Sequence, residues 1–103
     1  MEVELLVNKF INLNVFITGG SSGIGLAVAK SFLRKGARVF AVDNNIIKDD
    51  EFLSYEKSNF FLSDVRDFIG MKKIINKIFK KYIKIDVLIN SAGIINFKSI
   101  EES

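Results

Sequence analysis

The sequence contains no cysteine, no histidine, no proline and no tryptophan, and it has only two tyrosines. Without cysteine or histidine, the chain can form no disulfide and offers no thiol nucleophile, no imidazole for acid–base catalysis and none of the usual zinc ligands. The lack of cysteine is consistent with a reducing compartment, and we therefore expect a cytoplasmic protein.

Long apolar segments are also missing, although 49% of the 103 residues are hydrophobic and 26% are charged, as in an ordinary globular domain. No stretch approaches the roughly 20 apolar residues of a transmembrane helix. The N-terminus has Glu2 and Glu4 where a signal peptide carries positive charge, and the apolar run Leu5–Val7 is too short. We expect one small domain with no membrane partner.

The formal net charge is +3, and the basic residues are concentrated in one stretch. Six lysines lie there: Lys72, Lys73, Lys77, Lys80, Lys81 and Lys84. Two interpretations are a nucleic-acid-binding patch and the solvated face of an amphipathic helix. No aromatic residues lie among the lysines on the outer face to stack on bases, which favours the solvated helix. We therefore expect no nucleic-acid partner.

A glycine-rich segment, Thr18–Gly25 with the sequence TGGSSGIG, lies between a short run of β-branched and aromatic residues and a helical pattern. At such a turn, the unpaired N–H groups and partial positive charge of the helix N-terminus attract phosphate. Glycine allows positive φ angles and the close approach of a pyrophosphate. We expect Gly19 to make the turn, Gly23 to admit the ligand and Gly25 to let the helix lie close to the strand.

Two common phosphate-binding motifs do not match this segment. A P-loop requires Lys and then Ser or Thr after its last glycine, but Leu26 and Ala27 follow Gly25, which excludes an NTPase loop. The spacing GxGxxG does not fit either, because the glycines stand at positions 19, 20, 23 and 25. Ser21 and Ser22 add hydroxyls that can cap free N–H groups or bind phosphate oxygens.

The pattern that fits is TGxxxGIG, the cofactor signature of the short-chain dehydrogenase/reductase family, and the chain resembles that family over essentially its whole length. The resemblance implies an oxidoreductase that binds a nicotinamide dinucleotide. A glycine-rich loop without a ligand is the alternative. The strand before the loop, the helix after it and an acidic residue further along the chain favour the dinucleotide site.

Asp43 is that acidic residue, 20 positions after Gly23 at the end of the next predicted strand. A dinucleotide site needs an acid near there to accept hydrogen bonds from the adenosine ribose, and its carboxylate would repel a 2′-phosphate. No Arg or Lys stands at Ser22 or Asn44 to bind such a phosphate. We therefore predict NAD rather than NADP as the cofactor. A solvated aspartate at a strand end is the alternative.

Two further segments follow the third and fourth predicted strands. By resemblance to the family, Asp64 accepts from the adenine amino group and Val65 helps to hold the ring, with helix capping as the alternative role of Asp64. Asn90–Gly93 resembles the family's NNAG segment, from which Ser91 departs, and Asn90 has an alternative role in bridging adjacent strands. The predicted cofactor-binding residues are thus Gly19, Ser21, Ser22, Gly23, Ile24, Gly25, Asp43, Asp64, Val65, Asn90, Ala92 and Gly93.

Strand and helix patterns alternate as β-α-β-α-β-α-β. Four short apolar strands predict a parallel sheet covered on both faces, and right-handed crossovers give a partial, doubly wound Rossmann-type α/β sheet of order 3-2-1-4. The strands are expected at Val15–Ile17, Arg38–Val42, Asn59–Leu62 and Val87–Ile89, and the helices at Leu26–Leu33, around Lys48–Tyr55 and over residues 67–82.

Two of these helices have a predicted apolar face. The first is expected to gather Ile24, Ala27, Val28, Ser31 and Phe32 on one small or apolar face. The helix over 67–82 is expected to begin at Asp67 as its N-cap. Its apolar stripe comprises Phe68, Met71, Ile74, Ile75, Ile78, Phe79 and Tyr82.

The family's catalytic Tyr-x-x-x-Lys pair is absent from the sequence. Asn59 and Asp86 stand four residues after Tyr55 and Tyr82. Reduction of a carbonyl needs a proton donor beside the path of the hydride. We assign no catalytic residue and expect residues 1–103 to be the N-terminal dinucleotide-binding part of a family domain, truncated before its catalytic half.

Two functions stay open. The first is a partial NAD(P)-dependent oxidoreductase that binds the adenosine–pyrophosphate part of NAD, and the alternative is a non-catalytic nucleotide- or partner-binding module derived from the same fold. In the family, a fifth strand lies beside the fourth. Here Val87–Ile89 would be an edge strand whose apolar face lacks a covering helix. We expect self-association, or association with a complementing chain, through this edge.

Overall fold

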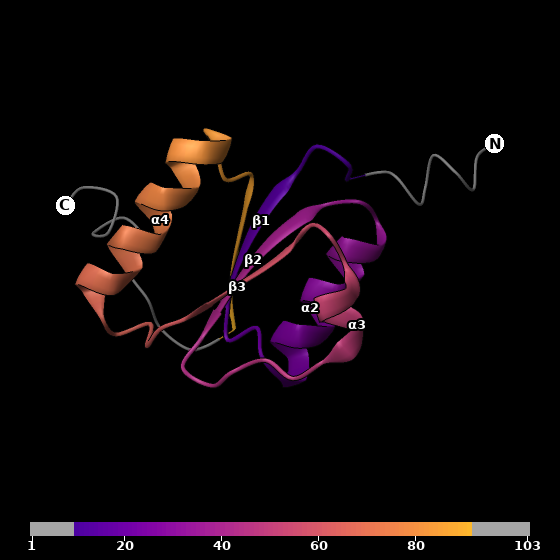
Figure 1. The fold of residues 1–103 in the computed structure, drawn as a ribbon, viewed down its shortest axis with the longest axis horizontal. Coiled ribbons are helices and arrows are strands. Elements are labelled where there is room, and N and C mark those ends of the chain that lie inside the picture. The colour runs from indigo at the N-terminus through magenta and orange to yellow at the C-terminus, as the bar shows by residue number, and fades with distance from the viewer. Residues whose placement is uncertain (1–9, 92–103) are drawn as a thin grey trace.

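The computed structural model describes residues 10–91, which form a parallel sheet with helices on both faces (Figure 1). The strands are β1 (Asn14–Thr18), β2 (Arg38–Asp43), β3 (Ser58–Leu62) and β4 (Val87–Asn90), and the helices are α2 (Gly23–Arg34), α3 (Asp50–Ser54) and α4 (Phe68–Tyr82). The strand order is β3-β2-β1-β4, and the three pairings are parallel. The predicted α/β class and strand order are confirmed, with most element ends shifted by one or two residues.

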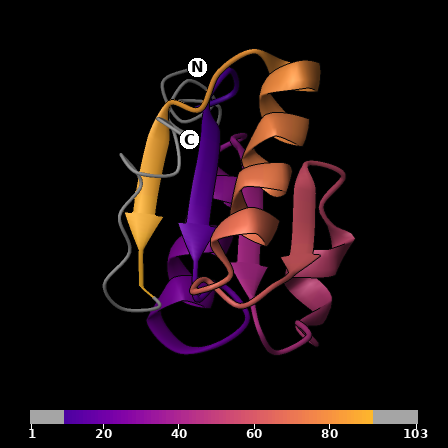
Figure 2. The same ribbon diagram turned by 90° about the vertical axis from the view of Figure 1, so that its left-hand side faces the viewer.

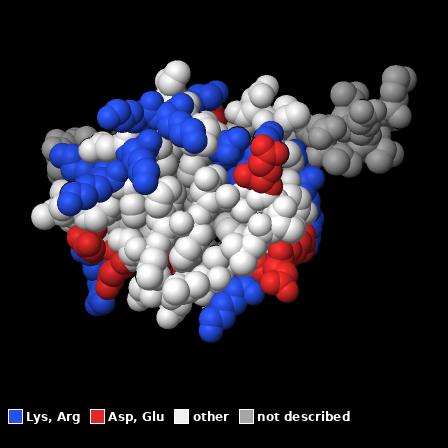
Figure 3. Space-filling model, in the orientation of Figure 1, with Lys and Arg blue, Asp and Glu red and all other residues white. Residues whose placement is uncertain are grey.

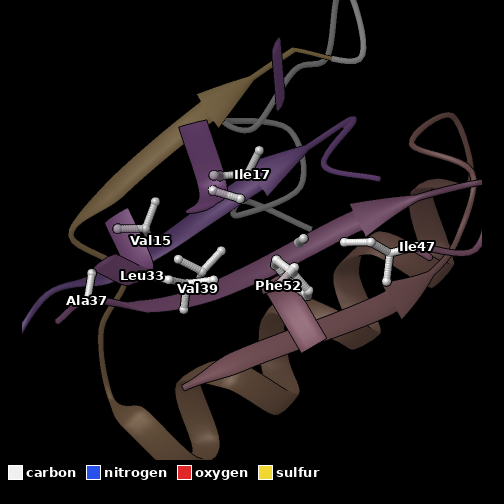
Figure 4. Packing of buried hydrophobic residues seen from close by; sticks show 9 residues of the cluster. Val15, Ile17, Leu33, Ala37, Val39, Ile47 and Phe52 are labelled. Carbon is white, nitrogen blue, oxygen red and sulfur yellow. The ribbon is translucent and has the colours of Figure 1, made fainter. Parts of the chain in front are cut away.

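The strands bury both faces because their side chains alternate between two apolar layers. The layer under α2 and α3 includes Val15, Ile17, Val39, Leu33 and Phe52 (Figure 4). The layer under α4 contains Phe16, Phe40, Val42, Met71, Ile75 and Ile78. Since β1 and β2 contribute to both layers, their nearly continuous apolar sequences follow from their position at the centre of the sheet.

Helix α2 lies on the sheet through a face that includes Gly25 and Ala29, which corrects part of the predicted face. Its buried residues, spaced four apart, are Gly25, Ala29 and Leu33. Ile24 is 79% exposed, and Ala27 is exposed as well. A Cβ atom on Gly25 would overlap the carbonyl oxygen of Gly19 and the hydroxyl of Ser91. The helix therefore comes closer to the end of β1 than a face of large side chains would permit.

Helix α4 covers the other face of the sheet and begins at the predicted cap. The carboxylate of Asp67 accepts a hydrogen bond from the N–H of Gly70 at 3.0 Å. The middle of the apolar stripe is buried, but Phe68 and Phe79 remain 40% and 38% exposed. Lysine and arginine side chains gather over this helix (Figure 3), as expected of its solvated face. Among residues 10–91, no helix is both long enough and apolar enough to span a membrane.

Strand β4 occupies an edge of the described sheet, beside β1 (Figure 2). Val87 and Ile89 pack against the layer under α2 and α3. Leu88, whose partner in the pairing is Phe16, is 45% exposed. Because Phe16 belongs to the layer under α4, Leu88 lies on the same side of the sheet as that helix, which packs over the other strands. The face of β4 that was expected to be uncovered is thus partly solvent-exposed within the described residues.

Candidate functional site

The carboxyl ends of the parallel strands surround a pocket of about 810 Å³, and this edge of an open α/β sheet is where ligands usually bind. Residues predicted to bind a cofactor line most of it: Gly19, Ser22, Gly23, Ile24, Gly25, Asp43, Asp64 and Val65. The structure adds lining residues that the prediction did not include, namely Asn44, Asn45, Arg66 and Ser91. Ser21 and Asn90 are not among the residues that line the pocket, and Ala92 and Gly93 fall outside the described residues.

Glycines shape the loop between β1 and α2. Gly19 and Gly23 have φ angles of 71° and 57°, in the left-handed region where a side chain causes strain. The N–H of Gly19 donates to the carbonyl oxygen of Val42 at 2.8 Å, which holds the loop against the end of β2. Among the described residues, a Cβ atom on Gly23 would meet no atom within 4 Å beyond its chain neighbours and the backbone of its own helix. The expected roles of Gly19 in the turn and of Gly25 between helix and strand are confirmed, whereas ligand admission at Gly23 stays a prediction.

The N-terminus of α2 forms part of the pocket wall and has no side-chain cap. Ser22 is at the N-cap position in extended backbone, but its hydroxyl does not make the capping hydrogen bond expected of it, and the first turn contains no acidic residue. The exposed side chain of Ile24 also lines the pocket. This end of the helix therefore offers N–H donors and a partial positive charge to an anionic ligand.

Asp43, at the end of β2, is held by the glycine loop. Its Oδ2 accepts from the Ser21 hydroxyl at 2.6 Å and from the Ser21 N–H at 3.1 Å, and its Oδ1 accepts from the N–H of Asn45 at 3.3 Å. Partial burial acts to raise the pKa of the Asp43 carboxyl, but the hydrogen bonds from Ser21 and the backbone outweigh it and lower that pKa. The Ser21 hydroxyl, expected to bind phosphate or cap the helix, thus bonds to the acid.

Asp64, just after β3, forms a local pair with Arg66. The Nη2 of Arg66 lies 2.7 Å from Oδ2, its Nε donates to both carboxylate oxygens at 3.1 and 3.2 Å, and its N–H donates to Oδ1 at 2.9 Å. Hydrogen bonds from the Arg66 side chain, and then from its backbone, lower the pKa of Asp64 to about 2. Asp67 caps α4, so the capping role considered for Asp64 is not the one observed. Sequence reasoning missed Arg66, although a cation two residues after a candidate acid is a recognisable signal.

Side chains tie the end of β4 to the end of β1. The hydroxyl of Thr18 donates to Oδ1 of Asn90 at 2.8 Å. The hydroxyl of Ser91 lies 2.6 Å from the carbonyl oxygen of Thr18 and 3.2 Å from that of Gly19. Asn90 therefore bridges the two strands, as its alternative role stated, except that its partner is a hydroxyl rather than a backbone group. Ser91, noted from the sequence only as a departure from the NNAG pattern, supports the glycine loop.

Comparison with known proteins agrees with this geometry. A family model described as short chain dehydrogenase matches residues 13–103. The 15-hydroxyprostaglandin dehydrogenase [NAD(+)] of Bos taurus is 34% identical over 94 residues, which cover 84% of this chain and 35% of that protein. The chain belongs to the short-chain dehydrogenase family. It is thus related to oxidoreductases, and it spans about a third of the length of the relatives it matches.

Solved structures of the family share this fold. A short chain dehydrogenase from Leptospira borgpetersenii serovar Hardjo-bovis with bound NAD+ matches with a TM-score of 0.75 and 30% identity, over 82% of this chain and 33% of that chain. A variant of ElxO with NADPH bound matches with a TM-score of 0.69 and 42% identity, over 80% of this chain and 35% of that chain. Because the two structures hold different dinucleotides, the fold of this family does not by itself determine which one is bound.

Neither tyrosine of this family member lines the pocket. Tyr55 donates its hydroxyl to Glu51 at 3.1 Å, and its pKa is raised by burial and then by that carboxylate. Tyr82 is the last residue of α4, and its ring packs against Phe40 of β2 with centroids 5.2 Å apart. Neither residue is placed to donate a proton in the pocket. The described part of the chain also contains no cluster of three or more side chains suited to hold a metal ion.

Proposed function

We propose that this chain binds the adenosine–pyrophosphate part of a nicotinamide dinucleotide, with NAD preferred to NADP, as the dinucleotide-binding part of a short-chain dehydrogenase domain. The observation that carries the proposal is the hydrogen-bonded Asp43 carboxylate in the wall of a pocket that also contains the uncapped start of α2. A bound NAD supplies hydride transfer. The residues of this chain hold its adenosine end.

The pyrophosphate binds at the start of α2. N–H groups of the first turn donate to phosphate oxygens, and the hydroxyl of Ser22 is available because it makes no capping bond. The empty space beside Gly23 supports this assignment, since any side chain there would project where the phosphates approach. Ile24 provides an apolar contact from the same turn, because its exposed side chain lines the pocket.

The adenosine binds between the ends of β2 and β3. Asp43 accepts hydrogen bonds from the ribose hydroxyls and repels a 2′-phosphate. Arg66 is a pocket-lining cation, but its guanidinium is paired with Asp64, which reduces the charge it offers to a phosphate. By resemblance to the family, Asp64 and Val65 hold the adenine. The segment after β4, with Asn90, Ala92 and Gly93, leaves room for the rest of the nucleotide.

Oxidoreduction is the proposed activity of the family domain to which these residues contribute. The catalytic Tyr-x-x-x-Lys pair is absent from the 103 residues, so we expect no turnover by this chain alone. We propose a cytoplasmic location because the sequence contains no cysteine.

Calorimetric titration of the folded chain with NAD, NADP and ADP-ribose tests the proposed dinucleotide binding. We expect NAD and ADP-ribose to bind with similar affinity and NADP at least about tenfold more weakly. Absence of saturable binding, or equal binding of NADP, would contradict it.

A second candidate function, a module that associates through β4, is favoured by the exposure of Leu88. An apolar residue on an edge strand provides a surface for self-association or for a complementing chain. Sedimentation of the wild type and of Leu88→Asp tests this role. Leu53→Asp is the matched control, because Leu53 is 55% exposed on α3, the helix of the other layer. If wild-type sedimentation is monomeric, or if both variants behave alike, β4 is not the association surface.

A further inference from the structure

Ser21 is the point at which the glycine loop reaches Asp43. We propose that Ser21 is a positioning residue for cofactor specificity, because it occupies one oxygen of the Asp43 carboxylate and leaves the other for the sugar of the dinucleotide. This inference rests on the proposed function. It assigns to Ser21 a role that differs from phosphate binding, and it explains why a residue of the signature segment does not line the pocket.

Both donors of Ser21 act on the same atom. The hydroxyl lies 2.6 Å from Oδ2 of Asp43 and the N–H lies 3.1 Å from it, in a partly buried contact between residues 22 positions apart. The short distance is typical of a hydroxyl that donates to an ionised carboxylate, which is among the stronger hydrogen bonds in proteins. The two shorter hydrogen bonds that orient the carboxylate therefore come from the loop, and the longer one comes from Asn45 in its own segment.

The second oxygen, Oδ1, is used less fully. It accepts from the N–H of Asn45 at 3.3 Å, which is a long hydrogen bond. An ionised carboxylate has about four lone-pair sites, and Asp43 lines the pocket. Oδ1 is therefore the atom with room to accept from a ribose hydroxyl while Ser21 keeps its place on Oδ2.

The same contact fixes the position of the charge that a ligand meets. Among the described residues, the other charged groups that line the pocket are Asp64 and Arg66, from the segment after β3, and they pair with each other. Donors from Ser21 stabilise the carboxylate of Asp43 in its ionised form. A fixed negative charge disfavours the 2′-phosphate of NADP, whereas the free oxygen favours the 2′-hydroxyl of NAD. Ser21 thus acts on specificity through Asp43.

Substitution of Ser21 tests this role with two independent measurements. Ser21→Ala removes the hydroxyl and keeps the N–H, and Ser21→Gly is a second such variant should the first fail to fold. Carbon-13 NMR titration of the carboxyl group should show a higher pKa for Asp43 in these variants. Calorimetric titration with NAD and NADP should show that the affinity ratio falls about fivefold to tenfold. Ser21→Thr keeps a hydroxyl and should preserve both values.

Ser54→Ala is the matched control, because this exposed serine on α3 donates to a backbone oxygen of its own helix and does not line the pocket. It should change neither measurement. An unchanged pKa of Asp43 in the Ser21 variants would overturn the proposed contact, and a shifted pKa with an unchanged NAD/NADP ratio would overturn the specificity role. Failure of the wild type to bind either dinucleotide would refute the proposed function and the specificity role together, while the NMR titration would still decide whether Ser21 holds the carboxylate.

Discussion

Two aspartates close neighbouring strands at the same edge of the sheet, yet they are held in different ways. Asp43, at the end of β2, receives its shortest hydrogen bond from Ser21, which is 22 positions earlier in the loop after β1. Asp64, after β3, is paired with Arg66, only two positions later. The Asp43 contact is partly buried, whereas the Arg66 side chain is 85% exposed.

The difference shows which acid depends on the tertiary structure. The pair of Asp64 and Arg66 needs only its own short segment, and its exposed charges are screened by salt. The contact of Asp43 with Ser21 exists only when the glycine loop is docked against β2, which in turn requires α2 to lie close to β1. The hydrogen bonding of the Asp43 carboxylate therefore depends on the docking of the loop, and that of the Asp64 carboxylate does not.

Gly25→Ala should break the comparison most strongly. The new Cβ atom would overlap backbone and side-chain atoms of Gly19 and Ser91, so we expect a loss of about 2 kcal/mol in the free energy of unfolding, measured with urea. The contact at Asp43 should be lost, while the local pair of Asp64 should persist in NMR spectra. Gly23→Ala is the matched control, because the new Cβ atom would meet open space. We expect this variant to lose only about 1 kcal/mol through backbone strain. Equal destabilisation by the two variants would contradict this account of α2.

Gly23→Val should abolish dinucleotide binding without disturbing either aspartate. Its branched side chain would project into the open space where we place the phosphates. A valine at φ 57° also strains the backbone by roughly 1–2 kcal/mol, so thermal melting must first show that the variant is folded. Calorimetry with ADP-ribose then measures the loss. Retained affinity in a folded variant would mean that the phosphates bind elsewhere.

Asp43→Ala should weaken NAD binding and improve the relative binding of NADP, because an acceptor and a repulsive charge are both removed. Loss of hydrogen bonds to a charged group predicts a change of about tenfold to a hundredfold in the affinity ratio. Asp64→Ala should weaken both dinucleotides equally, since adenine is common to them. Asp50→Ala, on α3 outside the pocket, is the control for lost charge. If the ratio stays at the wild-type value in Asp43→Ala, Asp43 does not contact the sugar.

The pH dependence of stability should show a smaller effect, which depends on Asp43. Folding lowers the pKa of Asp43 below its ordinary value of 3.8. The stability that it contributes is therefore present above pH 3.8 and lost as the pH falls through the native value. Asp43→Asn should remove this dependence, so the difference in melting temperature between wild type and variant should shrink in acid. A difference that is constant from neutral pH to pH 2 would show that folding does not perturb this carboxyl.

Arg66→Ala should produce the smallest effect. Without its partner, Asp64 should lose the pKa of about 2 and return toward 3.8. Because the pair is exposed, added salt should reduce the difference in the pKa of Asp64 between wild type and variant. The free energy of unfolding at neutral pH should hardly change. Carboxyl NMR titration at low and high salt measures both. A large change in stability, or any change in the pKa of Asp43, would show that the two acids are coupled.

Sequence reasoning predicted the features that depend on neighbouring residues. The N-cap at Asp67 was predictable because its acceptor lies three residues from the N–H that it binds. The left-handed Gly19 was predictable because a tight turn between a strand and a helix requires a residue without a side chain. The alternation of apolar strands and helices likewise predicted the parallel order, since crossovers in such sheets have one favoured hand.

The errors concern contacts between distant segments. The helical pattern placed Ile24 on the apolar face of α2, but the packing selected the smaller face that contains Gly25. Arg66 and Ser91 were not assigned to the pocket, although their segments were, because the resemblance assigned roles to neighbouring residues and the folded chain shows which further side chains line the pocket. The periodicity of a sequence indicates which residues share a face of a helix, but it does not determine which face lies against the sheet.

By itself, the sequence determined the family, the strand order and the positions of the glycine loop and the two acids, because each depends on local spacing and on rules of chain connection. Only the tertiary structure decided that Ser21 bonds to Asp43, whereas the pair of Asp64 and Arg66 needs no more than its own short segment. In a flexible loop, the hydroxyl of Ser21 could reach several acceptors. Which acceptor it binds follows from how closely α2 packs against β1. That distance is set together by atoms of Gly19, Gly25 and Ser91. Ser91 is far from the two glycines in the sequence, so no local sequence pattern predicts this packing.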